Sequence, residues 1–232
     1  MFPSYVSSSS GGSLSSSLTM SGVNLGTPAT NRLHLVGITT TRENAAPLLS
    51  CVKLGGVNMQ LISSRSAVSR GDEVNASLYA LIDNDLPDGS LADLVISGTF
   101  DAVIAGAVLI KDAEQSYLFG SESFSSIDRR DNYANTKSLV YSLLLIDVMS
   151  LYEHGGGATV FTDQIKIVDR DIYNAGALLM SLKKGYPLSE QMGWSWINKH
   201  RRQAHLIAAI AYSVPTAEPE RVVNALFFGG NM

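Results

Sequence analysis

Alternating apolar and polar side chains are the first pattern along the chain, and they occupy residues 32 to about 120. Segments 57–63 and 74–82 place an apolar residue at every second position, which is the spacing of a strand with one buried face. Segments 32–40 and 101–112 are short and almost wholly apolar, and turns containing glycine or proline separate the runs. This half therefore predicts five or six strands in an antiparallel β-sandwich or jelly roll.

The spacing of apolar residues changes from about residue 130. Segment 133–154 is apolar nearly all round and precedes three glycines, which predicts a buried helix and its end. Segments 169–185, 189–213 and 218–230 predict three more helices, and 159–168 is open between strand and loop. The predicted fold class is α+β, with an antiparallel, jelly-roll-like β half followed by a helical C-terminal half.

The N-terminal segment is rich in serine and glycine and poor in apolar residues. Such a segment buries too little apolar surface to offset its ordering entropy, so we predict a flexible arm held by a neighbouring subunit. No internal repeat is visible at a period of 20–50 residues. The predicted domains are an arm at 1–31, a β-sandwich core at 32–125, and a helical region at 126–232 packed on or beside the sheet.

Composition limits the classes of function. Charged residues are only 16% of the 232 residues, which suits a subunit packed against others and suits a large single core equally well. The formal net charge of −4 excludes charge-driven coating of nucleic acid or of an anionic membrane, so such contact requires a local basic patch. No run reaches the length of a transmembrane segment, and the N-terminus does not resemble a signal peptide. We therefore expect a protein that is not secreted.

Residues able to carry out chemistry are scattered. His200 and His205 are five positions apart and do not share a helix face, and no cluster supplies four zinc ligands. The acids at 83, 85 and 88 lack the glycine and glutamate of a calcium loop. We predict no catalytic residue, no cofactor and no metal, and hence no enzyme, although a site assembled from distant residues stays open as an alternative.

Two groups of basic residues are the candidates for contact with nucleic acid. They are Arg65, Arg70, Lys199, Arg201 and Arg202. The last three lie on a predicted helix just after two tryptophans, and basic side chains beside aromatic rings hold phosphates and stack bases. The alternatives are a solvated helix face with the tryptophans in the core, and for the first two arginines an exposed loop neutralised by neighbouring acids.

A family resemblance runs through residues 33–100. The matching residues are Leu35-Val36-Gly37, Gly55-Gly56-Val57, Leu61-Ile62, Arg65, Asp72-Glu73, Ser77-Leu78-Tyr79 and the turn at 84–87. This pattern resembles the core of the plant-virus 30K movement proteins, with Ser63 standing where the family has an aspartate. The resemblance implies a jelly-roll-like core, binding of single-stranded nucleic acid and oligomerisation at intercellular channels.

These observations lead to two hypotheses of function. The first is a viral, non-enzymatic, movement-type protein that forms homo-oligomers and binds single-stranded RNA. The alternative is a viral structural subunit, of the capsid or matrix type, assembled through its N-terminal arm. Either places the protein in the host cytoplasm, at a cell junction or in the virion.

Overall fold

The structure is a computed structural model in which β-strands dominate. The described part contains seventeen strands and a single 3-10 turn, η1 (Asp83–Asp85). Every strand pair is antiparallel. The described residues are 3–27, 31–69, 72–87, 89–113, 115, 120–126, 133–138, 144–152, 157–172, 175–184, 190–196 and 202–210.

The first nine strands form two facing sheets, which we call the first unit. In chain order they are β1 (Ser4–Ser13), β2 (Ser17–Asn24), β3 (Leu33–Arg42), β4 (Leu48–Leu54), β5 (Val57–Asn58), β6 (Gln60–Ser69), β7 (Asp72–Ile82), β8 (Leu91–Thr99) and β9 (Ala102–Lys111). The large sheet has the order β1-β9-β3-β7-β6 and the small sheet the order β2-β8-β4-β5. The chain thus crosses between the sheets repeatedly, and its first and last strands lie side by side.

The remaining strands, which we call the second unit, repeat this topology. They are β10 (Gly120–Ser126), β11 (Tyr133–Ser138), β12 (Leu144–Leu151), β13 (Thr159–Val160), β14 (Gln164–Ile172), β15 (Gly176–Lys183), β16 (Glu190–Ser195) and β17 (Gln203–Ile210). The large sheet is β10-β17-β12-β15-β14 and the small sheet is β11-β16-β13. Each strand has a counterpart at the same place in the first unit, and both orders are compatible with a jelly roll.

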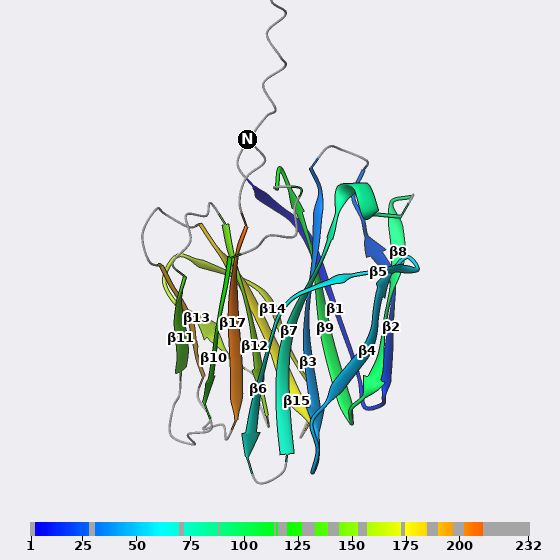
Figure 1. The fold of residues 1–232 in the computed structure, drawn as a ribbon. Coiled ribbons are helices and arrows are strands. Elements are labelled where there is room, and N and C mark those ends of the chain that lie inside the picture. Colours follow the sequence, from blue (N-terminus) through cyan, green and yellow to red (C-terminus); the bar gives the residue numbers. More distant parts are fainter. Residues whose placement is uncertain are drawn as a thin grey trace, which may run out of the picture.

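The two units pack through their large sheets, so the molecule has four layers, with the small sheets outermost (Figure 1). Strand β3 lies against β12 and β15, β7 against β12 and β17, and β9 against β14 and β15. At the edges, β1 meets β14, and β6 meets β10 and β17. Exchanging every strand for its counterpart reproduces the same set of contacts, which is the property of a twofold axis. The chain therefore has the arrangement of a symmetric dimer within a single polypeptide.

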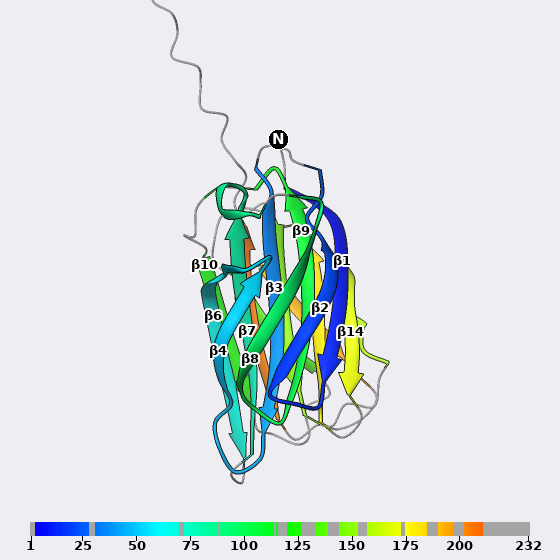
Figure 2. The same cartoon turned by 90° about the vertical axis from the view of Figure 1, so that its right-hand side faces the viewer.

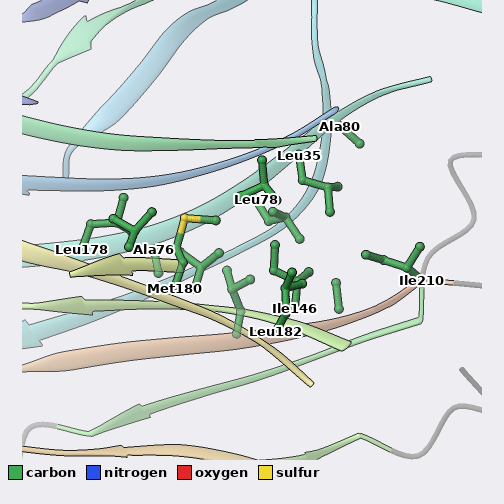
Figure 3. Packing of buried hydrophobic residues seen from close by; sticks show 14 of the residues in the cluster. Leu35, Ala76, Leu78, Ala80, Ile146, Leu178, Met180, Leu182 and Ile210 are labelled. Carbon is green, nitrogen blue, oxygen red and sulfur yellow. The ribbon is translucent and has the colours of Figure 1, made fainter. Parts of the chain in front are cut away.

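Apolar side chains fill all three spaces between the four layers. The central cluster joins the two large sheets and includes Leu35 and Leu78 of the first unit and Ile146, Met180 and Leu182 of the second (Figure 3). A second cluster lies between the sheets of the first unit, and two smaller clusters lie between those of the second. The large sheets are thus apolar on both faces, because each face covers a core.

Two glycines allow the large sheets to approach closely at their centre. Gly37 of β3 pairs with Gly106 of β9, and both lie on the face toward the second unit. A Cβ atom at either position would lie 2.7 Å from Sδ of Met180, closer than atoms in van der Waals contact. The pair therefore forms a depression in the first unit's sheet that holds the Met180 side chain of β15.

The prediction of a helical C-terminal half was wrong. Segments 133–154, 169–185 and 189–213 contain β11, β12, β15, β16 and β17, and the described part of the chain contains no α-helix. The strands β12, β15 and β17 are buried on both faces, so their apolar runs are continuous and resemble those of a buried helix. Segment 159–168, left open between strand and loop, contains both: β13, a turn at 161–163, and the start of β14. The helix predicted at 218–230 lies outside the described residues.

The strands predicted at 32–40, 57–63, 74–82 and 101–112 are confirmed, at β3, β5–β6, β7 and β9. The segment predicted as a flexible arm differs, because it contains β1 and β2. Strand β1 pairs with β9 along the large sheet, and β2 pairs with β8 along the small sheet (Figure 2). Backbone hydrogen bonds to these neighbours, rather than contact with another subunit, hold this serine-rich segment in place along one side of each strand.

Candidate functional site

In the part of the chain that the structure describes, the residues predicted to contact nucleic acid do not form one surface. Arg65 is exposed on β6, where it pairs with Ala76 at the rim of the space between the units. Arg202 is buried just before β17, and its guanidinium carbon lies 4.1 Å from the centre of the Tyr152 ring. This cation–π geometry gives Arg202 a packing contact instead of a solvent-facing one. Arg70, Lys199 and Arg201 lie outside the described residues.

The two tryptophans considered for base stacking are core residues. Trp194 is fully buried and Trp196 nearly so, both in the cluster between the sheets of the second unit. Their rings are therefore closed to a nucleic-acid base. The alternative that placed these tryptophans in the core is confirmed, while the helix predicted to carry them is strand β16.

A buried polar network lies inside the second unit, centred on the carboxylate of Asp147 on β12. Its Oδ1 accepts hydrogen bonds from the backbone N–H and the hydroxyl of Ser181, both at 2.7 Å. Its Oδ2 accepts the indole N–H of Trp194 at 2.8 Å and lies 3.1 Å from Nε2 of His205. Asp147, Ser181, Trp194 and His205 are all fully buried. The carboxylate therefore connects three strands of the large sheet to β16 of the small sheet.

Gln164 of β14 extends this network. Its side-chain amide donates to the Ser181 hydroxyl and accepts the backbone N–H of Gly193 on β16, both at 2.7 Å. The small sheet is thus attached to the large sheet by hydrogen bonds as well as by apolar contacts. Because the network is closed to solvent, its geometry suits a structural role in positioning β16, and it offers no access for a substrate.

Sequence reasoning missed this network. The only signal is a single aspartate inside the apolar run of 144–151. A charged residue there requires buried partners, but the partners come from residues 164, 181, 194 and 205, which are distant in the chain. Nothing in the spacing of these residues connects them before the sheets are assembled.

A second buried polar group is His34, on the face of β3 that points toward the small sheet of the first unit. Burial lowers the pKa of its imidazole to about 4, opposed by the Leu25 backbone and Asp83 and reinforced by Arg32. Neither ring nitrogen reaches hydrogen-bonding geometry with a described residue. The Leu25 carbonyl lies near enough to the ring to raise its pKa, but it is outside hydrogen-bonding geometry with the ring and accepts a hydrogen bond from Nη1 of Arg32 at 3.0 Å.

Exposed apolar side chains gather at one end of the first unit. Leu14, in the β1–β2 connection, is 67% exposed, and Leu48, at the start of β4, is 64% exposed. Leu48 pairs with Thr99, and the neighbouring Gly98 donates its N–H to the carbonyl of Ser16. The two leucines therefore belong to the same end, where the β1–β2, β3–β4 and β8–β9 connections meet (lower end of Figure 2). We call this the leucine end.

The strands β1 and β2 form the adjoining edges of the first unit, and neither contains a charged residue. Edge strands are commonly protected from pairing with other chains by lysine, proline or a bulge. Here each strand has one irregularity in register, between Tyr5 and Ser7 in β1 and between Met20 and Val23 in β2. Segment 17–20 of β2 is thus a regular, uncharged edge next to the leucine end.

Comparisons with protein-family models, with curated proteins and with solved structures gave no match to the chain. Among the residues described here, no helix has the length and apolar character needed to cross a membrane. The same residues contain no group of three or more side chains arranged to hold a metal ion. The leucine end, the uncharged edges and the two buried polar groups are the features on which a functional proposal can rest.

Proposed function

We propose that the protein is a self-associating structural subunit of a viral shell. The four-layer arrangement supports this proposal, because two units compatible with jelly rolls present both small sheets and their edges to the outside. The viral assignment rests on the resemblance of residues 33–100 to movement proteins, whose core has the same general shape as those of small capsid proteins. On this proposal the protein acts in the virion and in the host cytoplasm where virions assemble.

The leucine end carries the proposal. Two leucines that are each about two-thirds exposed, beside uncharged strand edges, favour burial against another molecule. Charged residues are only 16% of the chain. Arg42, Glu43 and Asp101 lie beside Leu14 at this end, so a partner must also accommodate these charges. A second copy of this chain is the simplest partner, since shells repeat one contact many times.

The test is to charge the leucine end. We expect the unmodified protein to form assemblies larger than its 24.8 kDa chain mass, and the Leu14→Asp/Leu48→Asp double variant to remain at that mass. Each buried interface side chain of this kind contributes about 2 kcal/mol, so the pair weakens association by roughly a thousandfold. Light scattering coupled to size-exclusion chromatography measures the mass, and negative-stain electron microscopy shows the particles.

Leu91 provides a matched control. It is 61% exposed at the opposite end of β8, where it pairs with Asn24. The Leu91→Asp variant introduces the same charge at similar exposure, so its assemblies should retain their size. A wild-type protein that stays monomeric at every concentration would contradict the proposal. Deleting residues 1–30 is a poor test, because this deletion removes β1 and β2 from both sheets of the first unit.

A second candidate function is the binding of single-stranded RNA by a movement-type protein. The exposed position of Arg65 on β6 favours it, together with the matching residues of the family resemblance. On this proposal the protein acts at cell junctions, and RNA crosses the rim between the two units near β6. The buried Arg202 is left out of the proposed contact.

This candidate predicts RNA retention that falls steeply with salt. We expect Arg65→Glu to lower the slope of log affinity against log salt by roughly 0.7, the contribution of one contact to a single-strand phosphate. Arg170→Glu, which changes an exposed arginine on β14, should leave the slope unchanged. Filter binding at two salt concentrations makes the measurement, and absence of retention at low salt would remove this candidate.

A further inference from the structure

A pocket opens between the edge strands β1 and β2 of the first unit, on the side away from the second unit's large sheet. Its volume is about 240 Å³. The wall is formed by three consecutive serines of β1, the end of β2 and the middle of β9, and His34 of β3 lies among the lining residues. The pocket is thus the space between the large and small sheets, open at the adjoining edges.

Strand register places hydroxyl groups and the imidazole on the same face of the large sheet. Ser7 pairs with Leu109, which pairs with His34 on the next strand, so all three side chains share a face. Ser9 pairs with Ala107 and lies on that face as well. Both serines are half-buried, whereas Ser10 is exposed. The pocket is therefore lined by hydroxyls of β1, and His34, two strands away on the same face, is among its lining residues.

His34 is only 1% exposed, and its two nitrogens have no hydrogen-bonding partner among the described residues. Buried polar groups in folded proteins are almost always paired, since an unpaired one is costly. The imidazole is neutral near pH 7, because burial holds its pKa at about 4. A neutral imidazole has one nitrogen that donates a hydrogen bond and one that accepts a hydrogen bond. A ligand hydroxyl can accept from the first nitrogen or donate to the second.

The lining also defines the charge and size of the ligand. None of the described residues lining this pocket is charged, and Arg32, whose charge acts on His34, is already paired with Asp83, so an ionic ligand would find no unpaired counter-charge in the lining. The side-chain amide of Asn24 donates to the Ser7 hydroxyl at 3.4 Å, which adds another neutral polar group at the mouth. The volume is smaller than that of most drug-sized sites and corresponds to roughly eight waters at about 30 Å³ each.

We propose that this pocket binds a small neutral polyhydroxyl molecule, of the size of one hexose ring, with His34 and the serines of β1 as its hydrogen-bonding partners. This site is independent of the leucine end, because it opens between β1 and β2 near the end of β2 that holds Asn24. A structural subunit that carries such a site recognises an uncharged sugar or polyol in addition to its own copies.

The experiment observes His34 directly in the full-length protein. Long-range proton–nitrogen spectra report its imidazole nitrogens during titration with glucose, galactose and mannose. We expect saturable shifts of the His34 nitrogens with at least one of these hexoses, and none with glucuronate, whose carboxylate has no counter-charge in the pocket. If none of the three hexoses gives saturable shifts, the pocket holds ordered water only, and the proposal is overturned.

Variants separate binding from folding. Ser9→Val replaces a half-buried hydroxyl with a side chain that suits a strand, and it should weaken hexose affinity about tenfold. Ser10→Val makes the same change at an exposed position outside the pocket lining and should leave affinity unchanged. His34→Phe should abolish binding if it folds. Equal affinity in Ser9→Val and Ser10→Val would overturn the proposed role of the serines of β1.

Discussion

We expect Asp147→Ala to lower the free energy of unfolding by about 3–5 kcal/mol, which is a large part of the stability of an ordinary domain. The substitution leaves the backbone N–H of Ser181 and the indole N–H of Trp194 buried without an acceptor. It also removes the carboxylate that lies 3.1 Å from the His205 ring and creates a small cavity between the sheets. Urea unfolding followed by tryptophan fluorescence measures the loss, because Trp194 reports on the network.

Two further substitutions make this result specific. Asp171→Ala changes an exposed aspartate on β14 of the same unit and should alter stability by no more than about 0.5 kcal/mol. Asp147→Asn keeps the shape and one acceptor oxygen, so its loss should lie between those of the two alanine variants. If Asp147→Ala loses less than 1 kcal/mol, the network does not hold β16 against the large sheet.

The second large effect is expected at the contact between the two units. Gly37→Val should lower the free energy of unfolding by about 3 kcal/mol, because it overpacks a buried site. Even the first added carbon would lie 2.7–2.9 Å from Sδ and Cε of Met180 and from Cγ2 of Val148. The backbone at Gly37 is regular strand, so valine brings steric overlap without a conformational penalty. Thermal or urea unfolding of the single variant gives the magnitude.

A double-mutant cycle identifies the cause. Met180→Ala alone leaves a cavity and should cost about 2–5 kcal/mol. It removes as many heavy atoms as Gly37→Val adds, so the double variant should be at least 1 kcal/mol more stable than the sum of the two losses predicts. Additive losses would show that Met180 does not occupy the depression at Gly37 and Gly106, and would contradict the close approach of the large sheets.

Strands of the first unit could be predicted for one of two reasons. Either one face of the strand is more buried than the other, or its residues favour strands. β7 carries β-branched and aromatic side chains, and the apolar residues Val57, Met59 and Leu61 alternate from β5 into the start of β6. Turn residues such as Gly55 and Gly56, which have positive φ and connect β4 to β5, mark where the chain reverses. In these segments local preference and the final environment agree.

The second unit contains the opposite case. β15 has the sequence GALLMSLK, composed mainly of residues that favour helices, and β12 is rich in leucine. Both become strands because each is central in its sheet, with hydrogen-bonded neighbours on both sides and a core on both faces. Continuous apolar character shows only that a segment is buried on every side, and it does not distinguish a central strand from a buried helix.

Local patterns were enough to predict a large apolar core, turns at particular glycines and an antiparallel sheet in the first half, because these features depend on neighbouring residues. The assembly of distant strands, by contrast, makes β1 and β2 from the serine-rich N-terminus, makes the second half repeat the first, and encloses Asp147 and His34. These outcomes depend on which distant strands form hydrogen bonds and which sheet faces pack together. The spacing of apolar residues within one segment carries no information about those long-range pairings.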